Sequence, residues 1–376
     1  NSRVRAAAYA SRAGRFAANL AAWVEAIASY EQALKLELDD PKRARIFLEM
    51  GTARFHKGDF ERASADLQAA VDLATAQHDW PLAESAHVAL TQSFLPQARF
   101  AEAIALAKEL SESGPPELAV CAEFCWGTGL SVESAHPIEA ELHLRESERL
   151  LHERGMHTSS VTLPQIMYQL AGVLGQQGRS PEAIDLYRKV LDMLDRGTAS
   201  LDILRNIMLF NNLAYQLYLA GDPSAAEYIR AGIEFAREKG SLSHMPYLYS
   251  TSGEIALARN DLDGAENYFR DGLALAEQIP VPERVAGLTA NLGLVAKARG
   301  ETDLACERLR KALDLATQLG SHHLEVRIRI WLAPLLSYEE GFLCLKAARA
   351  LAEQDGLRSL LEEIGGLENH LIPPRG

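Results

Sequence analysis

The chain has 376 residues, of which 48% are hydrophobic and 24% are charged, a balance that is typical of folded proteins. Its formal net charge of −13 argues against binding to nucleic acid or to anionic membranes, since both need clustered lysine and arginine. No apolar run reaches the roughly 18 residues of a membrane-spanning helix. The four cysteines form no Cys-x-x-Cys pair, which predicts a protein of the reducing cytoplasm rather than a disulfide framework.

A short pattern of small and large residues returns along the chain. In its first copy Trp23 is followed by Ala26, Tyr30 and Ala33, and clear later copies occupy residues 58–70, 178–187, 260–269 and 300–312. The small residues that align are Ala26, Ala63, Ala103, Ala140, Ala183, Ala226, Ala265 and Ala305. They are spaced 37 to 43 residues apart, and a ninth, poorly matching copy fits between His322 and Asp355.

Each copy predicts a pair of helices of roughly four turns each. The first helix ends at a residue that can adopt positive φ, as at Gly58, Gly178, Gly221 and Gly300. The small residue in the second helix lets the first helix approach closely, and the aromatic residue four positions later fills the space between neighbouring units. One pair cannot cover its own apolar face, so the pairs are expected to stack.

These residues resemble the signature of the tetratricopeptide repeat (TPR), in which Gly or Ala, Ala, an aromatic residue and Ala recur across a helix pair. The resemblance covers nearly the whole chain and is strongest in the first, second, seventh and eighth copies. A period near 40 is similar to long-helix variants, among them the sensor arrays of bacterial signal-transduction ATPases of the STAND class, arrays fused to bacterial kinases or cyclases, and peptide-pheromone receptors.

The resemblance implies an all-α fold, a right-handed superhelix (α-solenoid) of about nine TPR-like helix pairs. The array is expected to cover residues 1–356, followed by a capping helix at 357–371 and a tail or linker at 372–376. The ends of the chain, which starts with Asn1 and closes with Pro373 to Gly376, lead us to expect a piece of a larger protein.

Catalytic and metal-binding motifs are missing from the sequence. Residues 172–180 are rich in glycine but lack the Gly-x-x-x-x-Gly-Lys order that surrounds a phosphate. His322 and His323 would point about 100° apart on a helix, and Cys121 and Cys125 are best explained as buried small hydrophobes. We therefore expect no enzyme, no catalytic residue, no metal and no cofactor.

The first helices of a TPR superhelix line its concave groove. Counting along the fifth, sixth and seventh copies places tyrosine, amide and hydroxyl side chains there, which offer contact area and hydrogen bonds to an extended backbone. The predicted partner-binding residues are Gln165, Tyr168, Asn211, Tyr215, Tyr218, Tyr247, Ser250 and Glu254. The alternative is that Tyr215 or Tyr218 packs between helices. Arg15, Asn19 and Arg45 are too few for the cationic clamp with which some TPR proteins bind acidic C-termini.

These features predict a protein- or peptide-binding TPR module, and the resemblance suggests a role in signal transduction. The favoured hypothesis is the sensor or interaction part of a larger bacterial regulatory protein, with a neighbouring ATPase, kinase or DNA-binding output domain in the same polypeptide. The alternative is a free-standing scaffold or chaperone adaptor that joins partners. The sequence predicts no direct contact with nucleic acid or membrane.

Overall fold

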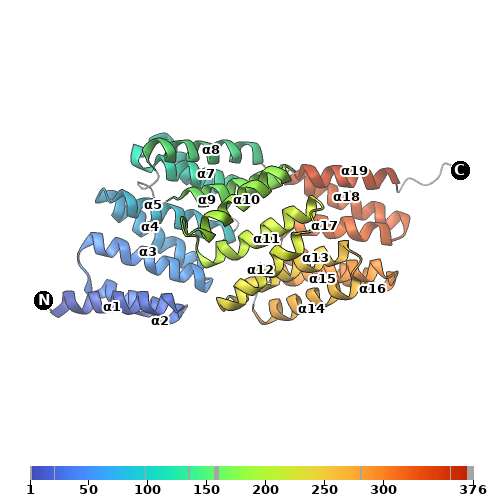
Figure 1. Cartoon of the computed structure of the whole chain (residues 1–376), viewed down its shortest axis with the longest axis horizontal. Helices are drawn as coiled ribbons and strands as arrows, with labels where there is room; N and C mark the ends of the chain where they lie inside the picture. Colours follow the sequence, from blue (N-terminus) through green and yellow to red (C-terminus); the bar gives the residue numbers. More distant parts are fainter. Residues whose placement is uncertain are drawn as a thin grey trace. The chain divides into compact units, whose positions relative to one another are not determined.

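The computed structural model describes residues 2–20, 22–97, 99–133, 136–155, 161–279, 282–355 and 357–370. These residues form α-helices, joined by short turns and four 3₁₀ segments, and they contain no strand (Figure 1). The chain divides into two compact units, unit 1 at residues 1–179 and unit 2 at residues 180–376.

The helices of unit 1 are α1 (Ser2–Asn19), α2 (Trp23–Leu36), α3 (Asp40–Lys57), α4 (Phe60–Ala76), α5 (Trp80–Phe94), α6 (Phe100–Ser113), α7 (Ala119–Glu133), α8 (Pro137–Arg154) and α9 (Leu163–Gln176). Those of unit 2 are α10 (Ser180–Asp195), α11 (Ile203–Leu219), α12 (Ala225–Glu238), α13 (Met245–Ala258), α14 (Leu262–Gln278), α15 (Pro282–Ala298), α16 (Thr302–Gln318), α17 (His322–Leu332), α18 (Tyr338–Gln354) and α19 (Arg358–His370).

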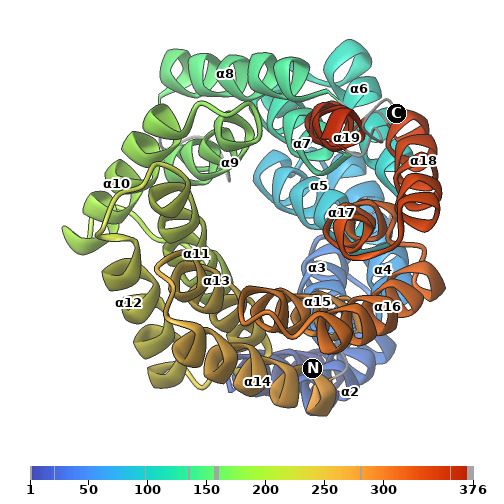
Figure 2. The same cartoon turned by 90° about the vertical axis from the view of Figure 1, so that its right-hand side faces the viewer.

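Within each unit the helices form two layers. Figure 2 shows α11, α13, α15 and α17 on the inner side of unit 2, with α12, α14, α16 and α18 outside them. Unit 1 has the same order, with α3, α5, α7 and α9 inside and α4, α6 and α8 outside. Inside each unit every helix packs against the next one along the chain, and successive inner helices such as α11, α13 and α15 also contact one another. The described residues are therefore an all-α repeat solenoid.

A glycine in the first helix of a pair lies against a large side chain in the second. The best example is Gly253 on α13, where an added Cβ would lie 2.3 Å from the ring of Phe269 on α14. In the same way, Gly14 lies against the side chain of Tyr30, and Gly51 lies against that of Leu67. Phe269 also belongs to a buried cluster with residues of α15, so the large residue fills space within its own pair as well as the expected space between pairs.

The aligned small residues are buried, with one correction. Seven of the eight predicted alanines are at most 1% exposed, but Ala226 is half-buried and its neighbour Ala225 takes the buried position. The sixth copy therefore slips by one residue, because α12 starts at Ala225, after a turn at residues 221–224. The predicted helix ends at Gly58, Gly178, Gly221 and Gly300 all have positive φ.

Replacing Ala265 with leucine should lower the free energy of unfolding by about 1–3 kcal/mol. Ala265 is completely buried and shares its cluster with Ala256 of α13, so a larger side chain must push the two helices apart. Ala183→Leu tests the equivalent position of the fifth copy. Urea denaturation measures the effect, and Ala258→Leu on the exposed end of α13 is the control. Equal midpoints for the three variants would contradict close packing at these alanines.

Neighbouring pairs are joined by polar side chains at the end of a first helix. Arg54 on α3 contacts Glu31 of α2 at 2.7 Å and Asp66 of α4 at 2.5 Å. In unit 2, Arg299 reaches back to Asp263 and Glu266 of α14. A cation at this position therefore connects a first helix to the second helix of the preceding pair.

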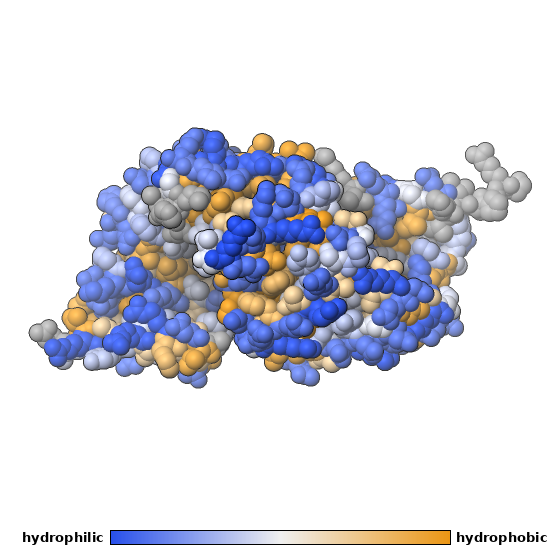
Figure 3. All heavy atoms as spheres, viewed as in Figure 1, coloured by the Kyte–Doolittle hydropathy of each residue, from blue (hydrophilic) through white to orange (hydrophobic). Residues whose placement is uncertain are grey.

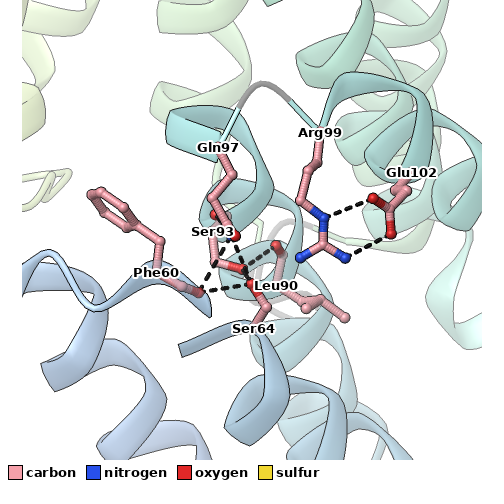
Figure 4. Close-up of polar contacts among 7 residues, drawn as sticks. All are labelled: Phe60, Ser64, Leu90, Ser93, Gln97, Arg99 and Glu102. Atoms are coloured by element: carbon pink, nitrogen blue, oxygen red, sulfur yellow. Dashed lines mark hydrogen bonds and ion pairs between the residues drawn. The ribbon is translucent and has the colours of Figure 1, made fainter. Parts of the chain in front are cut away.

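The third copy uses an amide for the same purpose, because α5 runs into the 3₁₀ turn Leu95–Gln97 instead of ending at a glycine. The Nε2 of Gln97 donates to the Phe60 carbonyl, the Ser64 hydroxyl and the Ser93 carbonyl, as Figure 4 shows. Beside it, the guanidinium of Arg99 holds both carboxylate oxygens of Glu102, at 2.7 and 2.6 Å.

At the C-terminal end of unit 2, α19 packs against α17 and α18, and Leu360 and Ile364 enter their buried cluster. The predicted tail at 372–376 lies outside the described residues, and the division into array, capping helix and tail stays a prediction.

Hydrophilic atoms predominate on the face shown in Figure 3, with apolar atoms in bands between them. Among the described helices, none combines the length and the apolar character that a membrane span requires.

Candidate functional site

Six of the eight predicted binding residues lie on two adjacent inner helices of unit 2. Asn211, Tyr215 and Tyr218 are on α11, and the other three, Tyr247, Ser250 and Glu254, are on α13. Asn211 and Ser250 are buried, while the three tyrosines and Glu254 are half-buried. We call the surface formed by α11, α13, α15 and α17 the inner layer of unit 2. Gln165 and Tyr168 lie on α9, in unit 1.

The two helices are joined by a buried hydrogen bond. The hydroxyl of Thr251 on α13 donates to the side-chain oxygen of Asn211 on α11 over 2.9 Å. Asn211 also donates to its neighbour Asn212 over 3.3 Å. Because both partners of the Thr251 bond are buried, this bond fixes how α11 and α13 lie against each other.

A second connection joins α13 to α15. The Ser250 hydroxyl donates to the Glu254 carboxylate over 3.1 Å, and the Asn291 amide of α15 donates to Ser250 over 3.2 Å and to Glu254 over 3.4 Å. Asn291 is only 6% exposed. Two separate sets of hydrogen bonds therefore join α11 to α13 and α13 to α15, and the second set, the polar network of Ser250, Glu254 and Asn291, holds the Glu254 carboxylate.

Burial also changes the protonation of this network. Loss of water contact is the main cause that raises the pKa of Glu254, and its hydrogen bonds and the charges of Arg327 and Arg284 oppose this only in part. Burial and the charge of Glu254 raise the pKa of Tyr215 and of Tyr218. The rings of these two tyrosines lie 6.1 Å apart. Both phenols therefore stay neutral and can donate and accept hydrogen bonds.

Two arginines complete the inner layer. The guanidinium of Arg284, in the first turn of α15, lies 4.7 Å from the centre of the Tyr247 ring. Arg327 on α17 lies 5.6 Å from the ring of Trp331, and its charge reaches Tyr215, Tyr218 and Glu254. The inner layer thus combines cations, the carboxylate of Glu254, amides and aromatic rings.

Sequence reasoning missed Thr251, Asn291, Arg284 and Arg327, although the repeat contained a signal for the first two. Thr251 follows its partner Asn211 by 40 residues, and Asn291 follows Ser250 by 41, so each lies about one period further along the chain. Adding one period to each predicted residue would have found both. The sequence gives no such signal for the two arginines, because the repeat pattern consists of apolar and small residues.

Gln165 has a different environment from the other predicted residues. Its side-chain oxygen accepts hydrogen bonds from the backbone N–H and the hydroxyl of Thr162, at 2.8 and 3.0 Å. This is the capping arrangement of a helix start, and it occupies the amide oxygen that was expected to meet a ligand. Tyr168, one turn further along α9, is half-buried. Whether either contacts a partner stays a prediction.

The chemistry of the inner layer is that of a binding surface. Hydroxyl, amide and aromatic groups converge there, with no nucleophile activated by a neighbouring base among the contacts described. Elsewhere, Cys121 and Cys125 are buried with their sulfurs 3.8 Å apart, and His322 contacts Asp355 at 2.9 Å. Within the described ranges, no three histidine, cysteine or acidic side chains are grouped closely enough to hold a metal ion.

No model of a known protein family matches the chain, and no curated protein matches its sequence. Solved structures match its fold. One is a STAND protein with a tetratricopeptide repeat sensor from Pyrococcus horikoshii, with TM-score 0.58 and 13% identity over 92% of this chain and 52% of that one. Another is a Rap protein complexed with Competence and Sporulation Factor, with TM-score 0.57 and 14% identity over 88% and 97%.

A third similar structure is aspartyl phosphate phosphatase F from Bacillus subtilis, with TM-score 0.55 and 12% identity over 93% of each chain. Identities this low show the fold and nothing beyond it. The predicted TPR-type fold is confirmed by these similarities.

Proposed function

We propose that this chain is a binding module and that the inner layer of unit 2 binds a peptide or an extended segment of a partner protein. The observation that carries the proposal is the Asn211–Thr251 hydrogen bond between α11 and α13 together with the polar network between α13 and α15, on helices that also carry Tyr215, Tyr218 and Tyr247. Burying polar side chains without need is unfavourable. A surface that keeps amides and phenols in fixed positions is suited to bind backbone groups.

An extended segment suits this surface for two reasons. Its backbone offers alternating donors and acceptors, which amides and phenols can pair with. The tyrosines add large rigid contact areas at a small cost in side-chain entropy. The similar structures described as a Rap protein complexed with Competence and Sporulation Factor and as a STAND protein with a repeat sensor are consistent with a ligand-binding array.

The double variant Tyr215→Ala, Tyr218→Ala should weaken peptide binding by about a hundredfold or more, since buried aromatic residues usually dominate binding energy. Suitable peptides are selected from a phage-displayed library of random 12-residue peptides on the wild-type chain, and their affinities are measured by fluorescence anisotropy. Tyr268→Ala is the matched control, because this tyrosine is 39% exposed on α14 in the outer layer.

Circular dichroism must show equal helix content in wild type and variants. Selected peptides that bind the double variant as well as they bind wild type would contradict the proposed site. Asn211→Ala is a poorer test, because Thr251 would lose its buried acceptor and the variant would lose stability together with any binding.

The wider role that we propose is that of a sensor in a larger bacterial regulatory protein, where ligand binding changes the activity of a neighbouring output domain. The alternative is a free-standing scaffold or chaperone adaptor. The reading frame that encodes the chain separates the two, because an ATPase, kinase or DNA-binding domain in the same polypeptide supports the sensor. A frame that encodes the repeat array alone supports the adaptor.

A further inference from the structure

The inner layer of unit 2 carries two arginines that lack a strong acidic partner among the described residues. Arg284 has only its chain neighbour Glu283, an exposed residue whose carboxylate lies 3.7 Å away. Arg327 forms no ion pair with any described acid. By contrast Arg329, two residues further along α17, is held by the buried Glu325 at 2.6 Å.

The side chain of Arg284 is held in place, but one of its hydrogen-bond donors has no acceptor among the described residues. Its guanidinium lies 4.7 Å from the centre of the Tyr247 ring, a stacking contact that fixes the orientation of the fork. Its Nε is buried, and within the described residues no acceptor lies in reach of it. Buried N–H donors in proteins are almost always paired, so this one is suited to an acceptor that a ligand brings.

Arg327 reaches the same surface from the next inner helix. Its charge opposes the rise in the pKa of Tyr215, of Tyr218 and of Glu254, so the guanidinium lies within electrostatic range of all three. Glu254 is the acid of the polar network, and the Ser250 hydroxyl and the Asn291 amide already bind its carboxylate. One acid that is bound in this way does not neutralise two arginines.

We propose that the segment bound by the inner layer of unit 2 carries a carboxylate side chain, from Asp or Glu, and that Arg284 and Arg327 bind it. This inference rests on the proposed function and adds the charge of the ligand. Arginine suits the role because its planar fork donates two parallel hydrogen bonds to a carboxylate. In a chain of net charge −13, two cations on one surface that lack a strong acidic partner attract an acidic ligand and repel a basic one.

Peptide selection on the wild-type chain tests the proposal. Peptides taken from the random 12-residue library should be enriched in Asp and Glu, and changing those residues in a selected peptide to Asn and Gln should weaken its binding about tenfold or more. This comparison alters only the peptide, so it does not depend on whether a protein variant folds. Affinity should also fall as sodium chloride is raised, since salt screens the attraction.

On the protein side, Arg284→Gln and Arg327→Gln should each weaken the acidic peptide by about tenfold or more and leave its Asn/Gln version unaffected. Arg310→Gln is the matched control, because Arg310 is exposed on α16 in the outer layer and the change in net charge is the same.

The outcomes separate the two proposals. Selected peptides without acidic enrichment that lose affinity in the Tyr215→Ala, Tyr218→Ala variant would overturn the carboxylate proposal and leave the binding site standing. If no peptide is retained above background, or if retained peptides ignore the tyrosine change, the proposed function fails and the carboxylate proposal fails with it.

Discussion

Replacing Phe269 with alanine should lower the free energy of unfolding by about 3–5 kcal/mol, one of the two largest stability effects that we expect in this chain. Phe269 is fully buried, lies against Gly253 of its own pair and shares a cluster with Leu288 and Leu292 of the next pair. Its removal therefore opens a cavity at the junction of two repeats. The shift is measured by urea denaturation followed by circular dichroism.

Phe342→Ala is the control for this experiment, because Phe342 on α18 is 46% exposed and loses little buried area when truncated. We expect Phe342→Ala to change stability by less than about 0.5 kcal/mol. A loss of under about 1 kcal/mol for Phe269→Ala would show that the two repeats are not packed as described.

Arg54→Met should cost about 3 kcal/mol at pH 7, because it leaves the carboxylate of Asp66 buried without its cation. The side chains of Arg54 and Asp66 are only 12% and 10% exposed, and their charged atoms lie 2.5 Å apart. The matched control is Arg62→Met, since Arg62 is 74% exposed and pairs with Asp59 only at 3.8 Å. Equal stability of the two variants would show that the Arg54 pair contributes nothing.

The same pair predicts a dependence on pH. Burial raises the pKa of Asp66 to about 6, and the charge of Arg54 lowers it only in part. In the unfolded chain the pKa of an aspartate is about 4, so the folded protein binds this proton more tightly. The contribution of Asp66 to stability is therefore fully present below pH 4 and is lost as the pH rises from about 4 to about 6.

In Asp66→Asn this step should be absent, so the difference in unfolding free energy between variant and wild type should change across that window and stay constant above pH 7. Loss of stability in Arg54→Met should likewise be smaller at pH 5 than at pH 7, because Asp66 can then take up a proton. A difference that does not vary with pH would contradict a raised pKa at Asp66.

The fold could be predicted because its signals are local. Alanines such as Ala183 and Ala265 and the turn glycines recur with the period of the repeat, and all of them occupy the expected positions. The exception is the sixth copy, in which the buried alanine is Ala225 and not the predicted Ala226, because α12 begins directly after the turn at 221–224. The end of α5 could not be predicted from the pattern, since a 3₁₀ turn follows this helix and the amide of Gln97 takes the place of the cation found in other copies.

The candidate site was harder to predict because it depends on contacts between repeats. The first helices were placed correctly, so Asn211 lies on α11 and Ser250 and Glu254 lie on the adjacent α13. Their partners Thr251 and Asn291 lie about one period further along the chain, so they are found only when the residues of successive copies are compared. Gln165, which was counted toward the groove, also caps its own helix, and its contact with a partner stays a prediction.

The opposition of glycine and a large side chain restricts how such a repeat can change over evolutionary time. Sixteen residues separate Gly253 from Phe269, and the same interval separates Gly14 from Tyr30, Gly51 from Leu67 and Gly293 from Leu309. A mutation of Gly253 to alanine first would place a carbon 2.3 Å from the ring, whereas a smaller residue at Phe269 first opens room that the alanine can then use. Neither substitution is neutral by itself, so the two positions should covary among relatives of this chain.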